Sequence, residues 1–482
     1  MYTIISVLTF GIFMGWASSS LDIVDFTLLF TVFILFILSI AIIKKPYIGV
    51  YSLIAMSPLV IYRYPLFQAF NLSAQRLFLV LSVISLALIL LNKRCTIQLY
   101  IKGMAVLKAQ ILTFLVFILL NLMMTLYSLN VSYAIRGVFT LIAGGIVMAL
   151  IVMVVSNRER LNTAIKVFIW SSILPLTIAF YQLYSWLAGK PVRLPLIVYL
   201  PLLHENSILH IPIGWEYRLE IPRLTGTFAE PNIFAMYLVG VLLFLICLIM
   251  SNIRKNRKIG LYLIILGVAN FSVLLMTFSR SGWFSLLIGL IPILLYNVDL
   301  AFKPKVFLML FTLLLITISL AFILAPDTVF SENVLLQRLE FRDMSLEGHI
   351  KTRLEGLQIF AKSPIIGAGL QSYGILTGQP EGVSSTHSPY FTYLAEGGLL
   401  GILFLLVWIG SIGKGIWTTF VKYGYKNKSR DFYYILAALS SFIALLFNNI
   451  LYHTLFADNS WVLLGLILSI VAICGKNHEK GE

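Results

Sequence analysis

The sequence predicts an all-α polytopic membrane protein with about 14 transmembrane helices. The chain has 482 residues, of which 60% are hydrophobic and 11% are charged, whereas soluble domains carry roughly 25% charged residues. Its mean hydropathy is +0.95, and apolar runs of roughly 18 residues or more recur along its whole length. We therefore expect residues 1–475 to form one integral membrane domain, followed by a cytoplasmic tail at 476–482.

Polar breaks separate the apolar runs and define the expected helices in chain order. The N-terminal stretch lacks the basic start of a cleaved signal peptide, so we expect it to be the first helix. The approximate spans are 3–17, 26–43, 47–62, 74–92, 106–127, 137–155, 164–186, 232–251, 259–278, 282–297, 306–325, 390–411, 432–447 and 460–474.

The distribution of Lys and Arg predicts that both termini lie in the cytoplasm. With this orientation the inner segments hold 22 of the 35 Lys and Arg residues, in line with the positive-inside rule. The outer segments hold 13, and nine of these lie in two long outer loops, 187–231 and 326–389, on which the rule has little force. This cytoplasmic excess explains the net charge of +15, so no nucleic-acid partner is expected.

The kind of cation also differs between the two sides. The inner segments contain 16 Lys and 6 Arg, whereas the outer segments contain 3 Lys and 10 Arg. Arginine presents a planar fork of donors that fits phosphate or carboxylate oxygens. The bias favours an anionic ligand on the outer face, with chance loop composition as the alternative.

Two arginines mark the outer ends of neighbouring expected helices. Arg223 precedes Glu230 and Asn232 in "RLTGTFAEPNIFA", where the loop 187–231 returns to the membrane. Arg280 lies in "TFSRSGW", within the next outer turn. We therefore expect Arg223 and Arg280 on the same side at similar depth, out of reach of a cytoplasmic substrate.

These two stretches combine with two more motifs further along the chain, which are "TRLEGLQIFAKSPIIGAGLQSYG" and "THSPYFTYLAEGGLLG". The combination resembles the O-antigen ligase and polymerase superfamily over roughly residues 210 to 410. The chain departs from the family pattern at two places. Glu230–Pro231–Asn232 stands where Asn-Pro-Asn is usual, and His387–Ser388 stands where His-Asn is usual.

The resemblance implies an all-helical membrane glycosyltransferase of type C in a bacterial cell (inner) membrane. It implies transfer of a growing glycan from undecaprenyl diphosphate to the non-reducing-end hydroxyl of the next lipid-linked unit, on the outer face. The product class would be O-antigen, capsule, exopolysaccharide or a teichuronic-type polymer. Fourteen spans favour a polymerase, and a ligase acting on lipid A core is the alternative. Expected partners are membrane lipid and undecaprenyl-diphosphate-linked oligosaccharide. A flippase and a chain-length regulator are further candidate partners.

Outside the cytoplasm the energy for a new glycosidic bond must reside in the donor. As the bond to the lipid diphosphate breaks, charge grows on the leaving group, and fixed cations there stabilise the transition state. We assign diphosphate binding to Arg223, Arg280, Arg136 and Arg353, with Arg280 also catalytic. The alternative is that these arginines anchor helix ends to lipid phosphates. This chemistry calls for no metal and no cofactor.

His387 is the first candidate for accepting the proton of the acceptor hydroxyl, or for hydrogen-bonding the diphosphate. Glu230 could be the base instead, or it could hold an arginine, although acidic residues are common at helix starts anyway. The candidate glycan contacts are Trp215, Tyr217, Asn232 and Tyr390, with an interfacial aromatic belt as the alternative for the tryptophan and the first tyrosine.

The loop 326–389 is expected to form a lid. Apolar residues at helical spacing in 333–343 and 351–361 predict short amphipathic helices on the membrane surface, with Arg338 and Arg342 as surface charges. The Pro and Gly residues of "PIIGAG" predict a turn.

Other readings stay open. Asp22 and Asp25 in the first outer loop could serve a metal-dependent mechanism. The spacing of His204, Glu205 and His210 matches no known metal site, and the three cysteines indicate neither a disulfide nor a metal. A transporter or flippase would use the polar residues inside spans, which are Gln110, Asn121, Gln182 and Asn270. A structural membrane component is a third reading, for which loss of Arg223 or Arg280 would affect stability alone.

Overall fold

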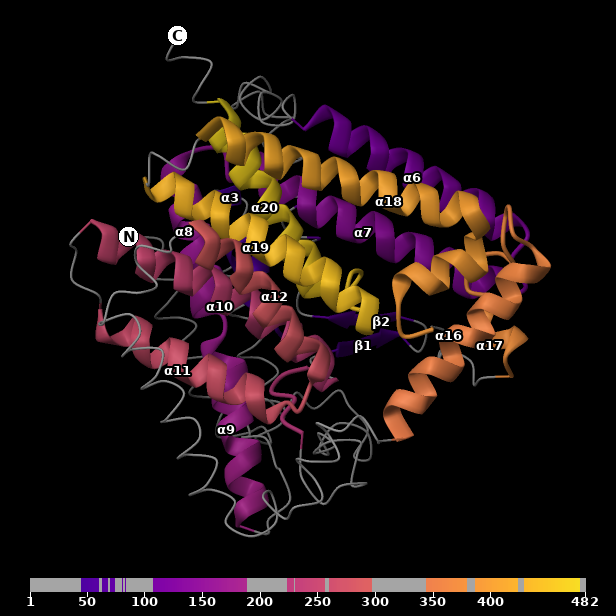
Figure 1. Cartoon of the computed structure of the whole chain (residues 1–482), viewed down its shortest axis with the longest axis horizontal. Coiled ribbons are helices and arrows are strands. Elements are labelled where there is room, and N and C mark those ends of the chain that lie inside the picture. Colours follow the sequence, from indigo (N-terminus) through magenta and orange to yellow (C-terminus); the bar gives the residue numbers. More distant parts are fainter. Residues whose placement is uncertain are drawn as a thin grey trace, which may run out of the picture.

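The computed structural model describes residues 45–59, 63–67, 70–73, 80, 83, 107–188, 223–228, 230–255, 260–296, 344–378, 386–423 and 429–476. The described part is helical apart from one antiparallel hairpin, β1 (Arg63–Phe67) and β2 (Phe70–Ser73), in which Arg63 pairs with Ser73 (Figure 1). The sequence did not predict this hairpin. The predicted spans 3–17, 26–43 and 306–325, and nearly all of 74–92, lie outside the described residues.

Within the described residues, seven helical segments are long and apolar enough to cross a membrane. They are α6 (Lys108–Leu126), α7 (Val131–Val154), the pair α8 (Arg158–Trp170) and α9 (Ile173–Leu187), α10 (Pro231–Arg254), α18 (Pro389–Tyr423), α19 (Arg430–Leu451) and α20 (Asp458–Lys476). Three shorter apolar helices are α3 (Pro46–Met56), α11 (Leu261–Met276) and α12 (Arg280–Tyr296). The multi-pass architecture is thus confirmed, whereas the count of fourteen is not.

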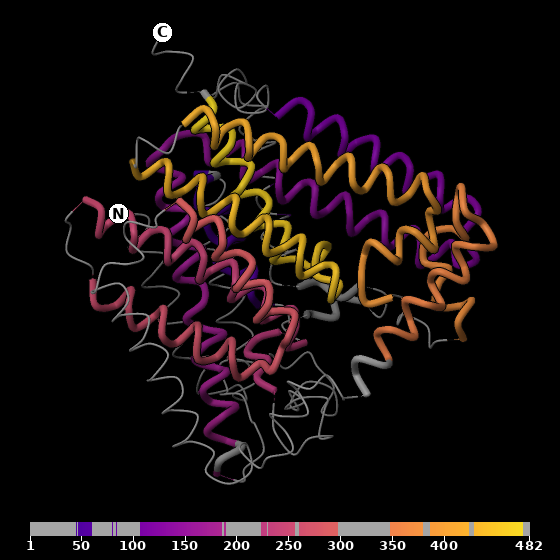
Figure 2. Tube along the Cα trace, viewed as in Figure 1, coloured from indigo at the N-terminus to yellow at the C-terminus, as the bar shows by residue number. Residues whose placement is uncertain are grey.

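The core lies where helices from the two halves of the chain interleave. Figure 2 shows the orange and yellow C-terminal helices beside the purple helices of the first half, and α18 packs on α6 while α20 packs on α7. Helices α10 and α20 are the most enclosed, each with 89% of its apolar window buried. In contrast α6 and α18 turn leucines such as Leu119 and Leu403 outward, as lipid-facing helices do.

Two helices begin earlier than predicted, because side chains cap their first turns. The Asn130 side chain accepts the Tyr133 N–H at 3.1 Å, so α7 begins at Val131 instead of 137. Similarly the Asn157 side chain accepts the Arg160 N–H at 2.9 Å, so α8 begins at Arg158 instead of 164. Arg136 is consequently a helical residue, whereas the sequence placed it in a loop.

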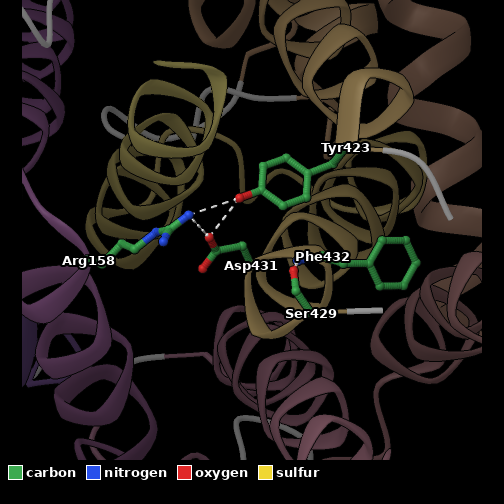
Figure 3. A network of polar contacts seen from close by, with 5 residues as sticks. All are labelled: Arg158, Tyr423, Ser429, Asp431 and Phe432. Carbon is green, nitrogen blue, oxygen red and sulfur yellow. Dashed lines mark hydrogen bonds and ion pairs between the residues drawn. The ribbon is translucent and has the colours of Figure 1, made fainter. Parts of the chain in front are cut away.

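Charged residues from two predicted inner segments meet at one end of the bundle (Figure 3). Arg158 of α8 forms an ion pair with Asp431 of α19 at 2.5 Å, and it also donates to the Tyr423 hydroxyl at 3.1 Å. The Tyr423 hydroxyl in turn donates to the same carboxylate at 2.7 Å. The segments that the charge distribution places on one side therefore lie together.

At the other end, helix α18 is broken at Gly398, whose φ is +60°. The predicted turn "PIIGAG" follows α16 (Met344–Lys362) and docks into this break. Leu399 N–H donates to Pro364 O at 2.8 Å, and Gly369 N–H donates to Glu396 O at 2.9 Å. The turn thus supplies the hydrogen bonds that the broken helix lacks, and it fixes the end of α16 to the bundle.

Only glycine fits at the break, so Gly398→Ala is expected to destabilise the fold by more than about 1 kcal/mol. A Cβ at residue 398 would lie 2.5 Å from the Ile365 carbonyl oxygen and would also face a positive φ. The measurement is thermal unfolding in detergent, with Gly410→Ala as the matched control. Gly410 lies on the same helix, and a Cβ there meets nothing within 4 Å. Equal unfolding midpoints for the two variants would contradict this account of the break.

Candidate active site

Arg223 joins two segments that are far apart in sequence. Its side chain is only 8% exposed, and its Nε donates to the Thr277 carbonyl oxygen at 2.9 Å. The neighbouring Leu224 N–H donates to Met276 O at 3.1 Å. The segment before α10 therefore packs on the turn between α11 and α12, and Arg280 follows Thr277 by three residues. The structure thus brings together the two stretches whose arginines the sequence singled out.

Arg280 begins α12 after a strained turn. Phe278 has a φ of +48°, which is rare outside glycine, and the Ser279 hydroxyl accepts the Gly282 N–H at 3.2 Å. A Cβ on Gly282 would lie 2.6 Å from the Cβ of Ala235, so α12 and α10 start side by side. Two helix N-termini at the same place favour an anion there.

Glu230 precedes Pro231 at the start of α10 and accepts a short hydrogen bond from the Tyr452 hydroxyl. Asn232 accepts from Arg223 Nη2 at 2.9 Å and also hydrogen-bonds the Tyr452 hydroxyl. Burial and the Glu230 carboxylate raise the pKa of Tyr452, so its hydroxyl stays protonated and donates. Sequence reasoning missed Tyr452; the signal was the polar run "YHT" directly after an apolar helix.

Two histidines lie against the Tyr452 ring. The rings of His349 and His387 meet edge to face with centroids 4.3 Å apart, and the Tyr452 ring stacks on His387 at 5.7 Å. His387 has a φ of +58°, in the left-handed region that residues other than glycine adopt uncommonly. Sequence reasoning also missed His349, because its helix brings it to His387 only in the folded chain.

The environment keeps His387 neutral near pH 7. Burial lowers the pKa of its imidazole, the nearby Glu230 carboxylate opposes that change, and the Arg353 guanidinium adds to it. The result is a pKa below the ordinary value of 6.5. Burial also lowers the pKa of the next histidine along, His453, to about 4. A neutral imidazole can accept a proton, which is what the predicted role of His387 requires.

Arg353 lies on α16, where the sequence predicted an amphipathic helix over 351–361. Its Nη2 donates to the carbonyl oxygens of Ile450 at 2.9 Å and Leu451 at 3.1 Å, and its guanidinium lies 5.7 Å from the centre of the Phe391 ring. Burial lowers the pKa of this arginine. Arg353 thus caps the C-terminus of α19 and fixes α16, the helix that carries His349, to it.

The remaining predicted residues lie elsewhere. Arg136 is exposed on α7 with its guanidinium over the Tyr133 ring at 5.3 Å, and none of the described contacts joins it to Arg223. The Tyr390 hydroxyl donates to Leu446 O at 3.1 Å, so it binds α19. The following predicted residues lie outside the described part of the chain: Asp22, Asp25, His204, Glu205, His210, Trp215, Tyr217, Arg338 and Arg342.

The polar residues that a transport path would need make hydrogen bonds within the protein, two of them to other segments of the chain. Gln110 donates to Ser411 O, Gln182 to Thr225 Oγ1, and Asn121 to Phe117 O. Asn270 similarly donates to Leu266 O. Among the described residues, no three His, Cys, Asp or Glu side chains gather closely enough to hold a metal ion.

Residues 266–406 match the family model described as O-antigen ligase. The match supports the resemblance of this part of the chain to the O-antigen ligase and polymerase superfamily. The matched segment includes Arg280, Arg353, His387 and Tyr390, whereas Arg223 precedes it. No curated protein matches the chain. The family is membrane glycosyltransferase-like and implies lipid-linked polysaccharide substrates within a membrane.

Proposed function

We propose that this protein polymerises lipid-linked oligosaccharide repeat units on the outer face of a bacterial cell membrane. The donor is a glycan on undecaprenyl diphosphate, and the acceptor is the non-reducing-end hydroxyl of the next lipid-linked unit. Both termini lie in the cytoplasm, since the Lys-rich segments then face inward. A flippase would supply the substrate, and a chain-length regulator would set the product length.

The observation that carries the proposal is the meeting of cations, an acid and a neutral base at one end of the bundle. Arg223 packs against the turn that leads to Arg280, at the paired N-termini of α10 and α12. Glu230 lies at the same helix start, and the electrostatic influence of its carboxylate reaches His387. A departing diphosphate needs cations such as Arg223 and Arg280. An incoming hydroxyl needs a base such as His387 with a carboxylate near it.

The reaction is a single transfer at the anomeric carbon. The acceptor oxygen bonds to C1 of the donor sugar while the bond from C1 to the diphosphate oxygen breaks, and the leaving diphosphate takes the bonding electron pair. Arg280 and Arg223 stabilise the charge that grows there. The acceptor proton passes to the His387 imidazole, and the Glu230 carboxylate stabilises the resulting imidazolium. No step requires a metal or a cofactor.

The other predicted residues take revised parts. Arg353 caps α19, so in this proposal it positions α16 and lowers the proton affinity of His387 without binding the diphosphate directly. Arg136, which is exposed on α7, is proposed to contact the lipid diphosphate as it enters the site. Asn232 orients Arg223, while Trp215, Tyr217 and Tyr390 remain the proposed glycan contacts.

The purified protein with lipid-linked repeat units alone is expected to yield a ladder of longer glycans, separated by gel electrophoresis. The reason is that these units supply both donor and acceptor. A chelator should leave the ladder unchanged. No ladder in the presence of intact, folded protein would refute the proposal, and strong inhibition by the chelator would refute its metal-independent chemistry.

The family description favours one second candidate, an O-antigen ligase that places the glycan on lipid A core. The same residues would serve it, because only the acceptor differs. Offering lipid A core as the sole acceptor distinguishes the two: a ligase attaches one glycan to it, whereas a polymerase leaves it unmodified.

A further inference from the structure

An unbroken chain of hydrogen bonds runs from Arg223 to Glu230 through two other side chains. Arg223 Nη2 donates to Asn232 Oδ1 at 2.9 Å, and Asn232 bonds the Tyr452 hydroxyl. The Tyr452 hydroxyl donates to Glu230 Oε2. These hydrogen bonds link Arg223, the proposed ligand of the diphosphate, to the Glu230 carboxylate near His387. Tyr452 comes from the connection between α19 and α20.

The chemistry of the two ends sets the direction of every bond. A guanidinium can only donate, and an ionised carboxylate can only accept. The amide oxygen of Asn232 therefore faces Arg223, and its NH₂ group faces Tyr452, which leaves the phenol proton for Glu230. Each bond polarises the next, so the chain strengthens as a unit.

The same tyrosine also contacts the base. Its ring stacks on His387 with the two planes 30° apart, and it meets His349 edge to face at 6.1 Å. The titratable groups around His387 come from α10, α16 and the connection between α19 and α20, and they are Glu230, His349, Arg353, Tyr452 and His453. Tyr452 alone among these both touches the His387 ring and hydrogen-bonds Glu230 in the described part of the chain.

We propose that Tyr452 is a positioning residue: its hydroxyl holds the Glu230 carboxylate beside His387 and, through Asn232, ties that carboxylate to Arg223. This inference rests on the proposed function. The imidazolium that forms on His387 during transfer is stabilised only if a carboxylate is held at a set distance from it. Tyr452 sets that distance without touching the reacting atoms.

Tyr452→Phe isolates the hydroxyl because it keeps the ring and its stack on His387. We expect kcat for polymerisation to fall by roughly 10-fold or more, the usual effect of losing a hydrogen bond to a charged group. We expect little change in KM, since the variant leaves Arg223 and Arg280 in place. The acidic limb of the pH profile should move to lower pH, because a carboxylate that is no longer held beside His387 raises the pKa of that imidazole less.

The matched control is Tyr423→Phe, which also removes a phenol donating to a carboxylate, that of Asp431, but at the opposite end of the bundle. It should leave kcat and the pH profile as in the parent protein. Comparable unfolding midpoints for the two variants would show that any difference in rate is not a difference in folding.

A second measurement does not depend on activity. Histidine labelled at ¹³Cε1 reports the pKa of His387 by NMR in detergent, and His387→Gln assigns its signal. Tyr452→Phe should lower this pKa, because the Glu230 carboxylate that raises it is no longer held in place. An unchanged pKa together with an unchanged kcat would overturn the role of Tyr452. If the parent protein makes no polymer, the proposed function fails, and the NMR titration still decides whether Tyr452 positions the carboxylate.

Discussion

Arg280→Ala is expected to lower kcat for glycan transfer by roughly 10²–10³-fold while leaving the protein folded. Arg280 occupies the first position of α12, beside the N-terminus of α10, where the charge of the leaving diphosphate is proposed to grow. Losing a fixed cation at that place raises the barrier more than it weakens ground-state binding. The measurement is the initial rate of polymer formation from lipid-linked units, with KM determined separately.

Two further variants sharpen this test. Arg280→Lys keeps the charge but loses the planar fork of donors, so an intermediate rate is expected. Arg158→Ala is the control, because Arg158 is a largely exposed cation at the other end of the bundle, paired with Asp431. Polymer formation by Arg280→Ala at the parent rate would remove Arg280 from the chemistry.

His387→Gln is expected to lower kcat by roughly 10²–10⁴-fold, the usual contribution of a general base. In the parent protein, burial lowers the pKa of His387, so the imidazole stays neutral until the pH falls below its ordinary value of 6.5. Activity should therefore persist at pH 6.5 and decline only as the pH falls further. The measurement is kcat/KM between pH 5 and 8, a range that brackets ordinary histidine titration.

The charged neighbours of His387 predict the direction in which their substitution shifts the acidic limb of this pH profile. Arg353 lowers the pKa of His387, so Arg353→Met should move the acidic limb to higher pH. Glu230 raises that pKa, so Glu230→Gln should move the limb to lower pH. Shifts in the opposite directions, or a limb absent from the profile, would contradict the assignment of His387 as the base.

Much of the candidate site was predictable from local sequence. Arg223 and Arg280 stood out as arginines at the outer ends of apolar runs, and the charge distribution placed both on one side. The segment 351–361 showed the spacing of an amphipathic helix and lies within α16. These features are readable because hydropathy and the asymmetry of Lys and Arg act on each segment independently of the others.

Other parts of the site depend on contacts between distant segments. Arg353 looks like a diphosphate ligand in sequence, but the fold brings the end of α19 to it, and it caps two carbonyl groups there. The sequence placed Arg136 in a loop, but the Asn130 cap starts α7 at Val131 and makes Arg136 a helical residue. The polar run after α19 marked Tyr452 only as a polar position, and its partner Glu230 lies 222 residues away along the chain.

The sequence by itself determined that the protein is a multi-pass membrane protein, that its cations divide unequally between two sides, and that it resembles the O-antigen ligase and polymerase superfamily. The first two properties follow from the transfer of each side chain between water and hydrocarbon, which residue type alone sets, and the third rests on short motifs. Only the tertiary structure decided which polar groups meet at the end of the bundle that holds Arg223 and His387. Hydrogen bonds such as those joining Asn232, Tyr452 and Glu230 depend on how helices pack, and packing is a property of the whole chain.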